Sequence, residues 1–94
     1  MSLDLNHFNI THNLRGMWQA AGIYNALYES HGKTAAEILP TLEAGLLWLA
    51  FHPTEAKKHN APNGWGLYEH ALPWLAEVCE YFRNHPEEKI DISR

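Results

Sequence analysis

Apolar and polar side chains alternate at both ends of the chain. In the segment 4–11, DLNHFNIT, Phe8 and Ile10 fall on one side of a two-residue period. Near the other end, Ile90 and Ile92 alternate with polar neighbours in the same way. A period of two is typical of strands with one buried face. The pattern therefore predicts that the domain begins and ends in a strand, with these four apolar side chains facing the core.

Between the two strands the apolar positions recur every three or four residues, which is the spacing of a buried helical face. The sequence predicts three main helices at about 13–30, 34–51 and 66–83, and a short one at 53–58. Thr34 and Glu37 have the spacing of a capping box at the start of the second. We expect an α+β fold in which these helices pack on a small sheet formed by the N- and C-terminal strands.

The chain has 94 residues, which leaves room for a single domain, residues 1–94. If the main helices alternate in direction, the two terminal strands become parallel neighbours, although antiparallel pairing is commoner in general. We expect the sheet to be two-stranded in the monomer. Its open edges would be covered by pairing in a homodimer.

The parallel arrangement brings three polar segments, 9–13, 63–66 and 93–94, to one end of the molecule. Two helix N-termini would open there and offer unpaired N–H groups to a polar or anionic ligand. The residues of this predicted binding site are Thr11, His12, Asn13, Asn63, Trp65, Tyr68 and Arg94.

Trp65 lies between Gly64 and Gly66, and the sequence leaves two interpretations of it open. In the first, the indole lies over a ligand or a partner, and the glycines let backbone approach closely. In the second, Asn63 caps the following helix and Trp65 is a hydrophobic plug that covers the core.

Charge and composition narrow the classes of partner. The formal charge is −4, and Lys57-Lys58 is the longest basic run. We therefore expect no nucleic-acid partner, because phosphate neutralisation needs a concentrated positive face. No apolar stretch reaches the roughly 18 residues of a membrane span, and no secretory signal pattern occurs, so we expect a cytoplasmic protein and no membrane partner. The apolar helical context of Cys79 indicates a buried thiol.

Seven histidines raise the question of metal or acid–base chemistry. None forms the His-Glu-x-x-His unit of zinc enzymes, and no Cys-x-x-Cys unit occurs. His12 lies where a strand gives way to a helix and is the one candidate for proton transfer. No catalytic motif accompanies it, so we expect no metal, no cofactor and no catalytic residue, and an enzyme is the less favoured class.

Several short motifs resemble a group of small uncharacterised proteins found in bacteriophage and bacterial genomes. The resemblance rests chiefly on NITHN at 9–13, NGWG at 63–66 and the final ISR at 92–94, and spans residues 9–94. Shorter matching pieces are Met17-Trp18, Ala21-Gly22, Gly32-Lys33-Thr34-Ala35 with Pro40, and Tyr68. It implies an accessory or phage-related context and adds no mechanism.

The leading hypothesis is a noncatalytic binding or interaction protein whose polar end recognises a protein partner or a small polar or anionic ligand. Two hypotheses from other classes stay open. One is a small His- or metal-assisted hydrolase that uses His12, and the other is a structural oligomerisation module. An exposed aromatic cluster would favour the first hypothesis, a tight histidine cluster the second, and a sheet continuous across subunits the third.

Overall fold

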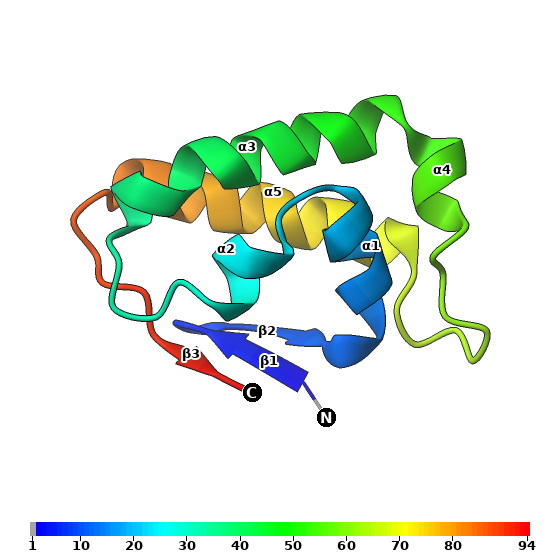
Figure 1. Cartoon of the computed structure of the whole chain (residues 1–94), viewed down its shortest axis with the longest axis horizontal. Helices are drawn as coiled ribbons and strands as arrows, with labels where there is room; N and C mark the ends of the chain where they lie inside the picture. The colour runs from blue at the N-terminus through cyan, green and yellow to red at the C-terminus, as the bar shows by residue number, and fades with distance from the viewer. Residues whose placement is uncertain (1) are drawn as a thin grey trace.

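Helices cover one side of a small sheet, as the sequence predicts. The computed structural model describes residues 2–94 and has an α+β fold. The two longest helices, α3 (Ala35–Phe51) and α5 (Tyr68–Asn84), run side by side, and the shorter α1 (Arg15–Ala20) and α2 (Tyr24–Tyr28) lie between them and the sheet (Figure 1). The helical layer therefore buries its apolar faces against the strands and within itself.

The sheet has three antiparallel strands in the order β2-β1-β3. The predicted N-terminal strand is in fact a hairpin: β1 (Ser2–Leu5) turns at Asn6-His7 into β2 (Phe8–Thr11). Asn6 has φ of 54°, in the left-handed region that asparagine tolerates better than most residues. The turn puts Leu5 opposite Phe8, so Leu5 lies in the core rather than on the polar face predicted for it.

The two terminal segments are not parallel neighbours, so that prediction is wrong. The last strand, β3 (Ile92–Ser93), pairs antiparallel with β1, which lies between β2 and β3. The expectation of a two-stranded sheet is also wrong, because the N-terminal segment contributes two strands and the C-terminal segment a third. Because β2 and β3 both run opposite to β1, they run in the same direction. Thr11, which ends β2, and Arg94, which follows β3, therefore lie on the same side of the sheet.

The predicted helix at 13–30 is helical but divided. A single 3-10 turn, η1 (His12–Leu14), leads into α1, and a break at 21–23 separates α1 from α2. Gly22 has φ of 77° in this break. Ile23 then packs against Gly45 of α3, where an added Cβ would lie 2.2 Å from the Ile23 side chain. The break lets η1, α1 and α2 change direction and pack around the core, which one straight helix could not do.

The other predicted helices are confirmed, with small shifts at their ends. The Glu37 carboxylate accepts the Thr34 N–H at 2.8 Å at the start of α3, as in the predicted capping box. The helix continues through Pro40, and α4 (Pro53–Lys57) follows. The Trp65 loop, residues 58–67, then leads to α5. The Asn60 side chain accepts the Tyr68 N–H there, a role expected of Asn63.

The core lies between the sheet and the long helices. Among residues 2–94, nineteen apolar side chains are buried, the largest being Trp18 and Phe82. Phe8 packs against this cluster and meets the rings of Trp74 and Phe82 edge-on, with centroids 6.3 Å apart in each pair. Cys79 is fully buried, and burial raises the pKa of its thiol to about 11.

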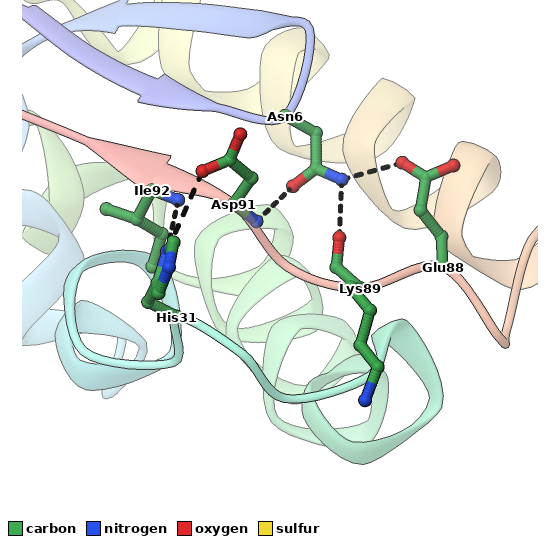
Figure 2. Close-up of polar contacts among 6 residues, drawn as sticks. All are labelled: Asn6, His31, Glu88, Lys89, Asp91 and Ile92. Carbon is green, nitrogen blue, oxygen red and sulfur yellow. Dashed lines mark hydrogen bonds and ion pairs between the residues drawn. The ribbon is translucent and has the colours of Figure 1, made fainter.

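Side-chain hydrogen bonds hold the segment before β3. The Asn6 amide donates to the Glu88 carboxylate at 2.6 Å and to the Lys89 carbonyl at 2.9 Å, and it accepts the Asp91 N–H at 3.0 Å (Figure 2). On the other side of the strand, His31 Nδ1 accepts the Ile92 N–H at 3.0 Å. These contacts fix the direction in which the chain approaches Arg94.

Candidate functional site

Five of the seven predicted site residues line one cavity of about 480 Å³. These are Thr11 at the end of β2, His12 and Asn13 in η1, Trp65 in the loop before α5, and Arg94 after β3. Three further residues, Arg15, Tyr24 and Tyr28, complete the lining of this Trp65 cavity. The polar segments thus meet at one end of the molecule, through an antiparallel sheet rather than the parallel one expected.

Hydrogen bonds hold the backbone of Trp65 on both sides. The Trp65 N–H donates to Asn63 Oδ1 at 2.9 Å, which closes a local turn. The Asn13 side-chain amide donates to the Trp65 carbonyl at 2.7 Å and ties the loop to η1. Thr11 in turn caps η1 by accepting the Asn13 N–H at 3.2 Å. The backbone that carries the indole is therefore tied to the end of β2 through η1.

The glycines beside Trp65 have two different roles. Gly64 has φ of 78° and open space around its Cα. Gly66 has φ of 129°, and an added Cβ would lie 2.9 Å from Asn13 Cβ. Only glycine permits both that conformation and that approach. Gly64 therefore serves the turn, and Gly66 serves the contact between the loop and Asn13.

The Trp65 indole points away from the core. Its exposed fraction is 74%, and it makes no ring–ring contact with another aromatic residue among residues 2–94. The interpretation of Trp65 as a plug over the core is therefore wrong. The backbone of Trp65 is therefore held by hydrogen bonds while its indole stays exposed to solvent.

The His12 side chain forms a hydrogen bond with the buried Tyr28. Its Nδ1 lies 2.9 Å from the Tyr28 hydroxyl, and Tyr28 is 3% exposed. Burial, with Arg15 and Arg94 nearby, lowers the pKa of His12 below its ordinary value. Burial raises the pKa of Tyr28. These opposite shifts leave His12 neutral and Tyr28 protonated, so the two side chains form a hydrogen bond between neutral groups.

Arg94 lies over the aromatic wall of the cavity. Its guanidinium carbon is 5.8 Å from the centre of the Tyr28 ring, a cation–π distance. A guanidinium nitrogen is 3.6 Å from a Glu29 carboxylate oxygen, in a pair whose two side chains are about half exposed. Exposed pairs of this kind contribute at most about 1 kcal/mol, so Arg94 remains available to a ligand.

Two predicted site residues lie outside the Trp65 cavity. Asn63 lines a neighbouring cavity of about 500 Å³, which shares His12, Asn13 and Arg15 with the first and adds Lys58 and His59. Tyr68 lines neither cavity. Its hydroxyl donates to the Leu49 carbonyl at 2.6 Å, which joins α5 to α3. We therefore assign Tyr68 a structural role and remove it from the site.

One N–H group at each of the two predicted helix N-termini already has a partner within the chain. The Asn13 N–H is taken by Thr11, and the Tyr68 N–H is taken by Asn60. The helical pieces after β2 are also short, three residues in η1 and six in α1. A macrodipole needs a longer run of aligned peptides, so side chains supply the polarity of the cavity.

The sequence interpretation missed Arg15, Tyr24 and Tyr28 as site residues. The two tyrosines fall on the apolar face of the predicted helix 13–30, which favours a place in the core, and Tyr28 is indeed buried. Their rings stack with centroids 4.6 Å apart, and both residues line the cavity. Arg15 carried a usable signal, because it follows Asn13 by two residues in a predicted helix start.

Searches for a metal site, for a membrane-spanning helix and for similar proteins do not assign a function. Residues 2–94 contain no group of three or more His, Cys, Asp or Glu side chains placed to hold a metal ion. Within the same residues, no helix has both the length and the apolarity to span a bilayer. Comparison with protein-family models, with curated proteins and with solved structures finds no match.

Proposed function

We propose that this protein is a noncatalytic binding protein that recognises a small polar or anionic ligand at the Trp65 cavity. The observation that carries the proposal is the presentation of Trp65: its backbone is hydrogen-bonded on both sides, while 74% of its side chain is exposed. Ordering a loop costs conformational entropy, and a loop whose backbone is already held reduces that cost on binding. The resemblance to small phage and bacterial proteins implies an accessory or phage-related context for this role.

The cavity has the character of a small-molecule site. Its volume of about 480 Å³ lies within the usual range of roughly 300–1,000 Å³. Aromatic walls from Tyr24, Tyr28 and Trp65 stand beside hydrogen-bonding groups from Thr11 and His12. Such a mixture binds a ligand by apolar contact and orients it by a few polar contacts.

The hydrolase alternative has less support. His12 hydrogen-bonds to Tyr28 rather than to Thr11, Ser93 or Tyr68, the hydroxyls that would serve as nucleophiles. The oligomerisation alternative rests on the open edges of β2 and β3 and has no further observation in its favour. We therefore retain the binding role.

Chemical-shift mapping by NMR tests the proposal. We would titrate the ¹⁵N-labelled protein with a panel of small carboxylates, phosphates and polar amides. The largest shifts are expected at the Asn13 side-chain amide and the Trp65 indole N–H, since both bound the same cavity. Shifts concentrated on the exposed face of α3 around Phe51, or none with any compound, would contradict it.

Phe51 offers a matched control for Trp65. Its side chain is 76% exposed, close to the 74% of Trp65, but it lies at the end of α3 and lines no cavity described here. Trp65→Ala should weaken the best panel compound at least tenfold, as is usual for a central aromatic contact. Phe51→Ala should leave its affinity within about twofold, and equal losses in the two variants would count against the proposal.

A further inference from the structure

The basic and acidic side chains are distributed unequally around the Trp65 cavity. The chain has eleven Asp and Glu residues and seven Lys and Arg residues. Among residues 2–94, no carboxylate side chain lines the Trp65 cavity or the neighbouring cavity, while Arg15, Lys58 and Arg94 do. In an acidic protein, cavities lined by basic side chains and by no carboxylate side chain favour the binding of anions.

Two guanidinium groups supply the charge of the Trp65 cavity. Arg15 forms no ion pair within residues 2–94, and Arg94 has only the exposed contact with Glu29. Both groups are close enough to His12 to lower its pKa, as burial also does. A neutral His12 then adds a hydrogen-bonding group and no charge. A phosphate dianion suits two guanidiniums better than a single carboxylate does. Each guanidinium can donate two parallel hydrogen bonds to phosphate oxygens.

The same cavity offers a free ring face. Tyr24 and Tyr28 are stacked on each other, and Arg94 lies over Tyr28, so these rings already have partners. The Trp65 indole has none among the described residues. A planar ring in the ligand would stack on this indole, as nucleobases do on exposed aromatic side chains.

The geometry points to a mononucleotide as the ligand: a phosphate held by Arg15 and Arg94, joined to a planar base that stacks on Trp65. This assignment rests on the proposed function and names the ligand class of the same cavity. The cavity volume of about 480 Å³ suits one nucleotide. The low number of basic residues fits a free nucleotide better than a nucleic-acid strand, which needs many phosphate contacts along a groove.

Titration with four probes tests each part of the ligand. Adenosine monophosphate, adenosine, ribose 5-phosphate and inorganic phosphate would be added to the full chain, with the Trp65 indole N–H followed by NMR. Adenosine monophosphate should bind at least tenfold more tightly than each of the other three, because only it joins a base to a phosphate. If inorganic phosphate bound as tightly as adenosine monophosphate, the base would contribute nothing to the affinity, and the inference would be overturned.

Two variants and a control separate the roles of charge and ring. Binding to the variants would be followed at the Asn13 side-chain amide, because Trp65→Ala lacks the indole N–H. Arg15→Gln should weaken adenosine monophosphate about tenfold and leave adenosine nearly unchanged, whereas Trp65→Ala should weaken both. Lys33→Gln removes an exposed positive charge outside both cavities and should change neither affinity. A loss of adenosine monophosphate binding that is equal in Arg15→Gln and Lys33→Gln would show a general charge effect and overturn the assignment.

The outcomes distinguish this inference from the proposed function. If the nucleotide fails to shift Trp65 and Asn13 while another panel compound does, the nucleotide assignment falls and the binding role stands. If no compound of either set shifts them, both fall. An adenosine tetranucleotide that binds tenfold more tightly than adenosine monophosphate would overturn the assignment to a free nucleotide in favour of a single strand.

Discussion

At the scale of single residues, Gly64 and Gly66 show how a loop is adapted to one side chain. Both have positive φ, so alanine at either position meets a backbone cost of about 1–2 kcal/mol. Only at Gly66 would the new methyl group also meet another residue, Asn13, at 2.9 Å. The two substitutions therefore share the conformational strain and differ in the contact.

We predict that Gly66→Ala displaces the Trp65 loop and Gly64→Ala does not. In Gly66→Ala, the hydrogen bond from the Asn13 amide to the Trp65 carbonyl should break, and the unfolding free energy should fall by about 1 kcal/mol more than in Gly64→Ala. Chemical denaturation gives the stabilities, and the NMR signal of the Asn13 side-chain amide reports the bond. An unchanged Asn13 signal in Gly66→Ala would show that the contact does not hold the loop.

At the scale of elements, Asn6 is the residue that joins the hairpin to the C-terminal segment. Its side chain makes three hydrogen bonds to the segment 88–91 (Figure 2). Asn6→Gly removes these bonds and still permits the left-handed backbone, so the expected loss of about 2 kcal/mol belongs to the bonds.

Asn9 is the matched control for this prediction. It also donates two side-chain hydrogen bonds, to Asp4 and Ser2, but these stay within the hairpin and are exposed. Asn9→Ala should cost about 0.5 kcal/mol or less by the same denaturation experiment. If Asn6→Gly costs no more than Asn9→Ala, the attachment of β3 depends on its pairing with β1 alone.

The elements also show what the sequence could and could not predict. Helical periodicity and the Thr34 cap located α3 and α5 well, because long amphipathic segments carry a strong signal. The hairpin was missed because Asn6-His7 lacks the glycine that marks most two-residue turns, and the alternation in 4–11 looks continuous. The strand order was missed because pairing between distant segments leaves no local pattern.

The candidate site was predicted in part for a related reason. Thr11, His12 and Asn13 were placed correctly at one end, since a strand-to-helix junction is visible in the sequence. The convergence with Arg94 holds although the parallel pairing on which it rested is wrong, because β1 between β2 and β3 restores a common direction. Tyr68 was misplaced because its hydroxyl bond to Leu49 depends on how α3 and α5 pack.

At the scale of the whole molecule, His12 and Glu88 give the stability a defined dependence on pH. The folded-state pKa of His12 is lowered from 6.5, so above that value the group is neutral in both states. As the pH falls below 6.5, the unfolded chain takes up the proton first, and stability is lost. Glu88, whose pKa is lowered from 4.5 by hydrogen bonds from Tyr81 and Asn6, adds a second loss as the pH falls below 4.5.

We predict that the unfolding free energy declines in these two steps as the pH is lowered. Denaturant titrations at a series of pH values would measure it. His12→Gln should reduce the slope just below pH 6.5 and leave the lower step intact, whereas Glu88→Gln should do the opposite. A slope just below pH 6.5 that is unchanged in His12→Gln would show that other groups carry that step.

We propose that the molecule holds Trp65 for a ligand and not for its own core. The most direct measurement is the unfolding free energy of Trp65→Ala, with Trp18→Ala as the scale for a fully buried indole. We predict a loss below about 1 kcal/mol for Trp65→Ala, against about 3–5 kcal/mol for Trp18→Ala. A loss of about 3 kcal/mol or more for Trp65→Ala would place its indole in the core and contradict the account of the site.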